Sequence, residues 1–260
     1  MFVRINAHPA AGYVHPRASE ITDQEADEGF NLEVASTAAR NYLRWVADLC
    51  SPHLGTSVLE VGAGRGSVTQ HLVEGRQLVA TDMSASSVEA MRRRFEAVPS
   101  VEVHQADLRT WNPGRTFDSV LMVNVLEHIR DDAGALLSLR RFVRPGGSIV
   151  VYVPAMNGLY GNWDEHVRHF RRYSKWRLRQ VMQQASLEPV ELRYANMLAM
   201  PAWLAFSMLM RVDPDGRQSL SIWDRTVVPA TRFLESRLRV PTGLNLLGVG
   251  RVPDRNTDGA

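Results

Sequence analysis

A glycine-rich segment between two apolar runs carries the residues best suited to chemistry. Residues 58–66 read Val-Leu-Glu-Val-Gly-Ala-Gly-Arg-Gly, and Asp82 closes the next apolar run, 20 residues beyond Gly62. Glycine has no Cβ, so the backbone can turn tightly there and approach a ligand closely. A helix beginning near Gly66 would direct free N–H groups at the same point, and an acid at the tip of the second strand can accept hydrogen bonds from a ribose diol. The segment predicts a site for a nucleoside-containing ligand.

The spacing of the glycines separates two cofactor classes. The dinucleotide fingerprint requires glycine at the first, third and sixth positions, and the sixth position from Gly62 is Ser67. That fingerprint therefore fails, which leaves E-x-G-x-G-x-G, a pattern that resembles the first motif of class I S-adenosylmethionine (SAM) methyltransferases. The alternative is a glycine turn in some other α/β protein. The resemblance implies SAM as cofactor and S-adenosylhomocysteine as product, bound by Glu60, Gly62, Ala63, Gly64, Gly66 and Asp82.

Three further segments resemble the same family, in the same order along the chain. Residues 101–108 resemble its third strand, which ends in an adenine-contacting acid. Residues 117–129 resemble the fourth strand and the turn beneath the methionine moiety, and residues 143–153 resemble its Pro-Gly-Gly turn and fifth strand. The resemblance implies additional cofactor contacts at Tyr42, Met83, Ala106, Asp107, Leu108, Asn124 and Val125.

Two segments resemble a bacterial subgroup of these methyltransferases. Residues 41–45 match its "NYxRW" element, which in that subgroup packs over the cofactor; an amphipathic helix on the sheet is the other interpretation. Residues 160–174 match its "D…GHxRRYS" segment, with Arg168 at the position usually held by glycine. With Trp223–Pro229 and the closing Gly-Leu-Asn-Leu-Leu run, the resemblance covers about residues 38–252. The subgroup needs no metal.

The alternation of apolar runs and helical periods predicts an α/β fold with a doubly wound, Rossmann-like sheet. The resemblance adds that the sheet has seven strands and that the last strand, within residues 243–252, is antiparallel. We expect an N-terminal arm and helical cap (1–50), a SAM-binding core (51–195), an apolar helical insertion or lid (196–239), and the last strand with a tail (240–260). Strands are expected near 57–62, 77–82, 101–106, 117–123, 147–153 and 190–194, and helices near 21–50, 66–73, 85–96, 132–143 and 174–185, the last capped by Ser174.

Composition narrows the class of protein. A chain of 260 residues with 45% hydrophobic residues can bury one substantial core, and a net charge of +2 does not demand a nucleic-acid partner. The single Cys50 forbids an internal disulfide, cannot build a zinc-like Cys/His cluster and fits a reducing compartment. The first ten residues lack the apolar core of a secretory signal. We therefore expect a cytoplasmic protein without a metal cofactor.

The apolar stretch 197–210 allows three interpretations. It is short for a membrane span and is interrupted by Pro201, so no span is expected. It is an ordinary buried helix, the wall or lid of an apolar substrate pocket, or a contact surface of a homodimer or with a membrane surface. In the lid interpretation Trp203 and Phe206 face the acceptor.

The loop after the fifth strand must cross the reactive end of the cofactor. Methyl transfer is an in-line displacement, so the enzyme mainly positions the acceptor and excludes water. A neutral hydroxyl or amine also needs a proton removed, and histidine titrates near the working pH. The candidates are His166, His169 and His128; loop stapling and architecture are their non-catalytic alternatives. Tyr160, Trp163 and Tyr173 are candidate substrate contacts, with aromatic packing as the alternative.

The sequence thus predicts methylation of a small-molecule acceptor at oxygen, nitrogen or carbon, with secondary metabolism as the expected context. A peptide, a carrier-bound molecule or RNA is the alternative acceptor, although an RNA enzyme would be expected to show an appended domain or a broad basic surface. The non-enzyme alternative is a SAM-binding regulatory protein without an acceptor site.

Overall fold

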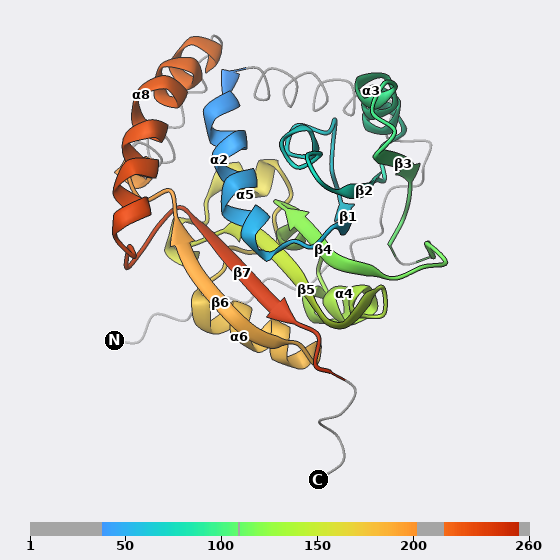
Figure 1. Ribbon diagram of the computed structural model, residues 1–260. Coiled ribbons are helices and arrows are strands. Elements are labelled where there is room, and N and C mark those ends of the chain that lie inside the picture. The colour runs from blue at the N-terminus through green and yellow to red at the C-terminus, as the bar shows by residue number, and fades with distance from the viewer. Residues whose placement is uncertain (1–37, 109, 202–215, 255–260) are drawn as a thin grey trace.

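The computed structural model describes residues 38–108, 110–201 and 216–254, which form one seven-stranded sheet with helices on both faces (Figure 1). The strand order is β3-β2-β1-β4-β5-β7-β6. The first five strands are parallel, whereas β7 runs antiparallel to both β5 and β6. The strands are β1 (Ser57–Val61), β2 (Gln77–Asp82), β3 (Val101–Gln105), β4 (Phe117–Val123), β5 (Val143–Pro154), β6 (Glu188–Ala195) and β7 (Asn245–Arg251).

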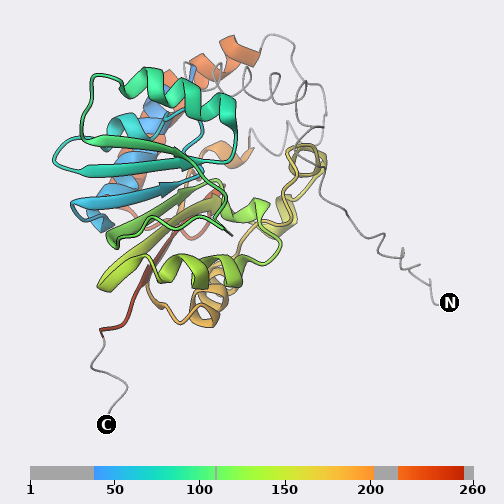
Figure 2. The same ribbon diagram turned by 90° about the vertical axis from the view of Figure 1, so that its right-hand side faces the viewer.

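Alternate residues of the central strands pack against two different layers of helices. Leu78 and Leu121 face one cluster, which includes residues of α2 (Arg40–Cys50) and α8 (Gly216–Arg237). Val79 and Val120 face the opposite cluster, which includes residues of α4 (Asp132–Arg140) and α6 (Lys175–Gln184). The layers are visible when the molecule is turned by 90° (Figure 2). Because both faces are covered, the central strands read as nearly continuous apolar runs.

The remaining helix of the doubly wound core, α3 (Ala85–Phe95), packs its buried Val88, Met91 and Phe95 against Ala80 of β2. Three short 3-10 helices and one short α-helix lie in the connections that follow the strands. They are η2 (Thr69–His71), η3 (Leu126–His128), η4 (Asn157–Leu159) and α5 (Asn162–His166), and a fourth 3-10 turn, η1 (Ser51–His53), follows α2.

The predicted fold class is confirmed, and three boundaries differ. Residues 66–73 form only the single 3-10 turn η2 in place of a helix, because Gly64 and Gly66 adopt φ of +56° and +77°, which a right-handed helix cannot contain. Strand β5 begins at Val143 and not near 147. The predicted helix from Ile21 is described only from Arg40 onward.

The cap of α6 and a helix within the insertion agree with expectation where the structure describes them. Ser174 caps α6, since its side chain accepts a hydrogen bond from the Arg177 N–H. The insertion contributes the 22-residue helix α8, while Trp203 and Phe206 lie outside the described residues. Within the described ranges, no helix combines the length and apolarity that a bilayer crossing needs.

Candidate functional site

The glycine turn between β1 and η2 leaves open space at one position only. Gly62, Gly64 and Gly66 all have positive φ. A Cβ on Gly62 would overlap the Val125 side chain, and one on Gly66 would overlap the Phe95 ring. A Cβ on Gly64 would meet nothing within 4 Å. Gly62 and Gly66 are therefore required by packing, whereas Gly64 borders the space into which a ligand can come close.

Asp82, at the carboxyl end of β2, holds this turn from the neighbouring strand. Its Oδ2 accepts a hydrogen bond from the Gly64 N–H at 2.8 Å, and its Oδ1 accepts one from the Ser84 N–H at 2.9 Å. Burial raises the pKa of Asp82, although these backbone N–H groups oppose the shift. Each carboxylate oxygen has a second lone pair, so Asp82 can still accept hydrogen bonds from a diol.

Glu60, in β1, presents an unsatisfied acceptor beside the same turn. Its side chain is buried, and Oε2 has no hydrogen-bond partner among the residues that the structure describes. Burial raises its pKa to about 7. An unsatisfied buried polar atom costs about 1–3 kcal/mol, and a ligand ammonium group would supply the missing donor. The position and chemistry of Glu60 fit the amino-acid end of SAM.

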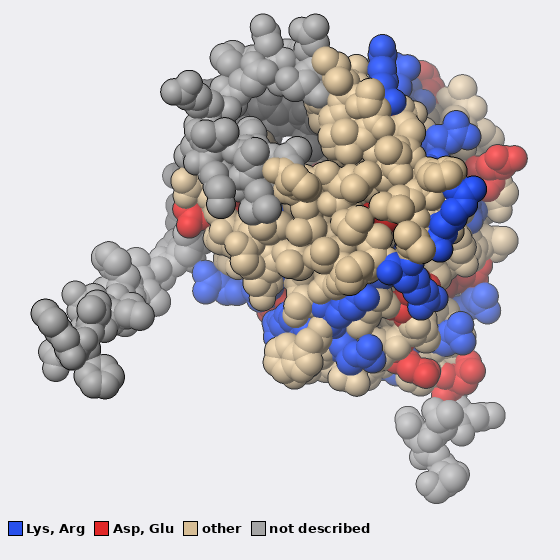
Figure 3. Space-filling view, turned by 90° about the vertical axis from the view of Figure 1, so that its left-hand side faces the viewer, with Lys and Arg blue, Asp and Glu red and all other residues tan. Residues whose placement is uncertain are grey.

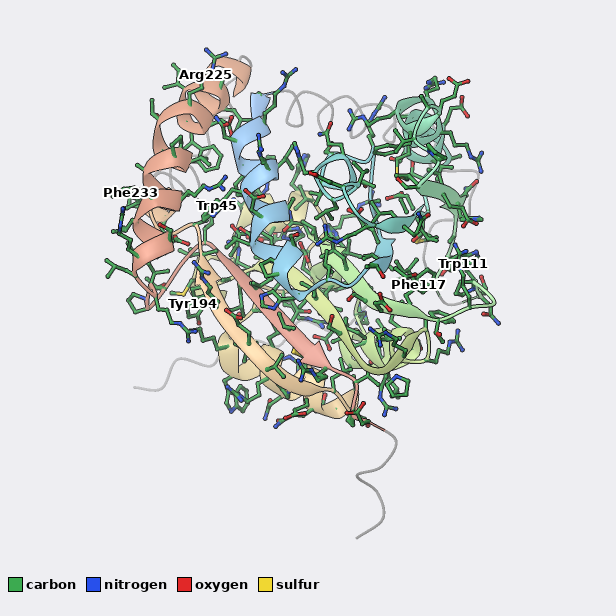
Figure 4. The ribbon with its side chains drawn as sticks, viewed as in Figure 1. Trp45, Trp111, Phe117, Tyr194, Arg225 and Phe233 are labelled. Atoms are coloured by element: carbon green, nitrogen blue, oxygen red, sulfur yellow. The ribbon has the colours of Figure 1, made fainter. Side chains whose placement is uncertain are left out.

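The segment that resembles "NYxRW" forms the first turns of α2 and is fastened by α8. Asp224 of α8 accepts hydrogen bonds from the Asn41 and Tyr42 N–H groups at 3.0 and 2.8 Å, in the manner of a helix N-cap supplied from another element. The Tyr42 ring lies 5.5 Å from that of Trp223, and its hydroxyl lies 3.4 Å from that of Tyr152 in β5. Trp45, labelled in Figure 4, adds a further aromatic ring to this region and is buried in the same cluster as residues of α8.

Other predicted cofactor residues follow the strand ends. Ala106 follows β3, and its N–H donates to the Asp82 carbonyl. Met83, after β2, is 62% exposed. Asn124, after β4, has φ of 52°, which turns the chain sharply at the sheet edge. Asp107, Leu108 and Val125 lie in the same edge connections, and Asp107 accepts backbone hydrogen bonds from Thr110 and Trp111.

A second constellation joins η3, after β4, to the loop after β5. We call Glu127, His128 and His169 the histidine centre. The His128 and His169 rings lie 4.7 Å apart, and the Nε2 atom of His169 lies 3.9 Å from Oε1 of Glu127. The backbone fastens the two segments, since the Phe170 N–H donates to the Glu127 carbonyl at 2.8 Å. The ligand atoms of the three side chains all lie within 4.8 Å of one another.

His169 is oriented by a buried ion pair. Its Nδ1 lies 2.8 Å from Oδ1 of Asp164, and both oxygens of Asp164 accept from Arg172 Nε at 2.9 Å. Burial opposes ionisation of Asp164, but the hydrogen bonds from His169 and Arg172 lower its pKa below the ordinary value. Asp164 therefore stays a carboxylate, which holds the Nδ1–H of His169 and leaves Nε2 directed toward Glu127.

Glu127 and His128 are both held away from their charged forms. Neither carboxylate oxygen of Glu127 has a hydrogen-bond partner in the described part of the chain, and burial raises the pKa of Glu127 to about 8. Burial, together with the neighbouring His169, lowers the pKa of His128 to about 4. Glu127 and His128 therefore place a protonated acid beside a neutral imidazole at neutral pH.

Of the remaining predicted site residues, His166 and Tyr160 lie at the surface, whereas Tyr173 is buried. His166 is exposed at the end of α5, 5.8 Å from the Trp163 ring, and is not part of the histidine centre. Tyr160 donates its hydroxyl to the His169 carbonyl at 2.8 Å and is partly exposed. Tyr173 corrects the sequence-based expectation of substrate contact: it is fully buried, and its hydroxyl bonds to Leu126 and Asp132, so it belongs to the core.

Sequence reasoning did not single out Glu127 or Asp164 as functional residues, although they lie inside the segments that it examined. The signal was the fixed spacing of Asp164, His169 and Arg172 within the "D…GHxRRYS" resemblance. Their contact arises because the loop turns back at Arg168, whose φ is 59°. That left-handed conformation explains why glycine is usual at this position.

Comparison with known proteins agrees with this geometry. Residues 58–147 match a family described as "Methyltransferase domain". This part of the chain is similar to that family. The match begins in β1, includes the glycine turn, Asp82 and η3, and ends within β5. It stops before Asp164 and His169, which therefore lie outside the matched part.

One curated relative is the trans-aconitate 2-methyltransferase of Azoarcus sp., which is 36% identical over 112 residues. These residues are 42% of this chain and 41% of the relative. The chain thus matches only about half or less of the length of the curated relatives.

Solved structures share the fold over more of the chain. A methyltransferase of Haloferax volcanii, in complex with the Trm112 activator, superposes with a TM-score of 0.60 at 19% identity and covers 91% of this chain and 97% of its own. A geranyl diphosphate methyltransferase in complex with SAM gives a TM-score of 0.56 at 15% identity, over 80% and 85% of the two chains. At these identities the likeness concerns the fold, and it confirms the Rossmann-like class.

Proposed function

We propose that this chain is a SAM-dependent methyltransferase of a small-molecule acceptor. The observation that carries the proposal is the pairing of a buried, partnerless Glu60 oxygen with open space over Gly64 and with Asp82 on the next strand. A ligand that fits must supply a cationic donor at one end and a diol at the other, with little bulk between them at the turn. SAM has these groups in this order.

The relatives and the distribution of surface charge both favour a small-molecule acceptor. The named relatives act on trans-aconitate and on geranyl diphosphate, which are small molecules. The face drawn in Figure 3 mixes lysine and arginine side chains with acidic ones over its right side and lower half, and its upper centre is largely uncharged. On this face the basic side chains do not form the broad basic surface expected of an RNA enzyme. Oxygen, nitrogen and carbon acceptors all remain compatible with the site.

In the proposed reaction, the chain mainly positions groups. SAM, when bound, supplies an electrophilic methyl group on a sulfonium. Glu60 would hold the amino-acid end of the cofactor, Asp82 the ribose, and the Asn124–Val125 turn the region between them. The proton of a hydroxyl or amine acceptor would be lost at the histidine centre, for which His169 is required and His166 is not. This choice follows from the orientation of His169 by Asp164 and from the exposure of His166.

The lid and the assembly state are part of the proposal. The loop between β5 and α6 and the insertion 196–239 would cap the carboxyl edge of the sheet, with Tyr160 and Trp163 near the acceptor. A cap over that edge would exclude water from the transfer step. Among the described residues, α8 reaches the cofactor side through Asp224 and Tyr42. A homodimer contact through the insertion is the competing role.

Calorimetry with S-adenosylhomocysteine tests the cofactor assignment. Asp82→Ala should weaken binding by roughly 2–4 kcal/mol, at about 1–2 kcal/mol for each hydrogen bond lost. Glu60→Gln should weaken it as well, because the ammonium group loses its counter-charge. Glu89→Ala is the matched control, since Glu89 is an exposed acid of α3 paired only with Arg93, and it should bind as the wild type does. Unchanged affinity in both site variants, or NADPH binding of equal strength, would refute the assignment.

A further inference from the structure

The histidine centre has the composition of a metal site. Two imidazoles and one carboxylate converge, and the three ligand atoms lie within 4.8 Å of one another. Two ligand atoms at about 2.0–2.2 Å from one tetrahedral ion lie about 3.3–3.6 Å apart. The 3.9 Å between His169 Nε2 and Glu127 Oε1 is within about 0.6 Å of this spacing.

The carboxylate of Glu127 is an acceptor without a donor. Its side chain is fully buried, and neither Oε1 nor Oε2 has a hydrogen-bond partner in the described part of the chain. Buried carboxylates are normally paired, hydrogen-bonded or bound to a cation. A cation between Glu127 and the two imidazoles would supply the missing partner for the acid.

The surrounding charges favour one divalent ion. Asp164 and Arg172 are both buried and neutralise each other, so they leave Glu127 as the acid without a counter-charge. Asp164 accepts the Nδ1–H of His169, the arrangement by which a carboxylate orients a metal-binding histidine and increases its basicity. The ligand shell and the group that orients it are thus both present.

We propose that Glu127, His128 and His169 bind a divalent transition-metal ion such as Zn²⁺. Two imidazole nitrogens with one carboxylate oxygen suit zinc and its first-row neighbours, whereas Mg²⁺ prefers an all-oxygen shell. Three protein ligands leave at least one coordination position open, as catalytic metal sites do. The sequence led us to expect no metal because the chain has a single cysteine and resembles a subgroup that needs none. Neither observation predicts that η3, after β4, and the loop after β5 meet.

The metal site has one consequence for the proposed methyl transfer. This consequence rests on the proposed function, whereas metal binding itself does not depend on it. An acceptor hydroxyl at the open position would have its pKa lowered by the ion. Its proton would pass to water, and the oxygen would bond to the methyl carbon. The carbon–sulfur bond would break with its electron pair on sulfur, which yields S-adenosylhomocysteine. His169 would then act as a ligand and not as a free base.

The test is titration of Zn²⁺ into the chelator-treated, full-length protein without a polyhistidine tag, followed by calorimetry. One equivalent should bind to the wild type, and Mg²⁺ should bind far more weakly. His128→Ala and Glu127→Gln should each weaken Zn²⁺ binding at least about tenfold, and Asp164→Asn about 10–100-fold through the orientation of His169. His166→Ala is the matched control, because it removes a nearby exposed imidazole outside the centre, and its Zn²⁺ affinity should be unchanged.

Two further measurements keep the result decisive. Circular dichroism identifies any variant that fails to fold; His128 lies partly exposed, so His128→Ala gives the cleanest comparison. Co²⁺ bound to the wild type should show a visible spectrum that changes in His128→Ala. An absence of saturable Zn²⁺ or Co²⁺ binding, or binding unaltered in both His128→Ala and Glu127→Gln, would overturn the metal site. S-adenosylhomocysteine affinity, measured on the same samples, would reveal separately whether the proposed function fails.

Discussion

The Nδ1 atom of His169 lies 2.8 Å from the Oδ1 atom of Asp164, and this contact organises the loop between β5 and α6. The same loop backbone is closed by the His169 N–H, which donates to the Asp164 carbonyl at 2.7 Å. Arg172 completes the unit from the far side of the carboxylate. The loop therefore carries its own buried polar core, and its stability and its function depend on the same residues.

Asp164→Ala should destabilise the protein strongly. Arg172 is only 3% exposed, and the substitution leaves its charge buried without its main partner. Removal of one member of a buried pair typically costs about 3–5 kcal/mol. Urea denaturation followed by circular dichroism measures the free energy of unfolding. A loss below about 1 kcal/mol would show that the loop contributes little to global stability.

Glu127 should make the protein less stable as the pH rises. Its pKa is about 8 in the folded state and about 4.3 in an unfolded chain, so the folded state binds more protons between these values. Its contribution to stability is therefore complete below about pH 4 and declines until about pH 8. Glu127→Gln should remove this part of the decline. The check is the difference between wild-type and variant unfolding free energies from pH 5 to 8, measured with a chelator present; a difference independent of pH would contradict the prediction.

Arg168→Gly should be at least as stable as the wild type, because φ of 59° favours glycine. A left-handed conformation costs other residues roughly 1–2 kcal/mol, which the greater entropy of glycine in the unfolded chain partly offsets. Arg168→Val, which places a β-branched side chain at this φ, should be destabilised relative to the glycine variant. Thermal unfolding of the two variants provides the comparison. Equal midpoints for glycine and valine would show that the backbone relaxes at this position.

Asp224→Ala should loosen α8 from α2. The carboxylate of Asp224 caps the Asn41 and Tyr42 N–H groups, and loss of an N-cap costs about 0.5–2 kcal/mol. Asp48→Ala is a matched control, because Asp48 joins the same two helices through an exposed ion pair with Arg232 that should contribute less than about 1 kcal/mol. Chemical denaturation should rank the two variants in this order. The reverse order would mean that the cap is not maintained in solution.

The fold could be predicted largely from local patterns. Residues 58–66 and Asp82 predicted two parallel strands and the turn between them, because glycines without a Cβ and alternate buried positions are properties of the local chain. The Ser174 cap was predicted for the same reason. The helix expected over 66–73 was wrong. Gly66 has a positive φ, and a Cβ there would overlap the Phe95 ring of α3, a long-range packing relation that local periodicity does not contain.

The sequence by itself determined the class of the sheet, the glycine turn and the acids that flank it, since each depends on residues close together in the chain. Only the tertiary structure decided which histidines meet. His169 approaches Glu127 and His128 because β4 and β5 are adjacent and parallel, so their following segments emerge at one edge. His166, only three residues away, is exposed at the end of α5 and lies outside the histidine centre, and the turn at Arg168 separates it from His169. The orientation of a side chain in a loop depends on long-range contacts, and these exist only once the sheet has formed.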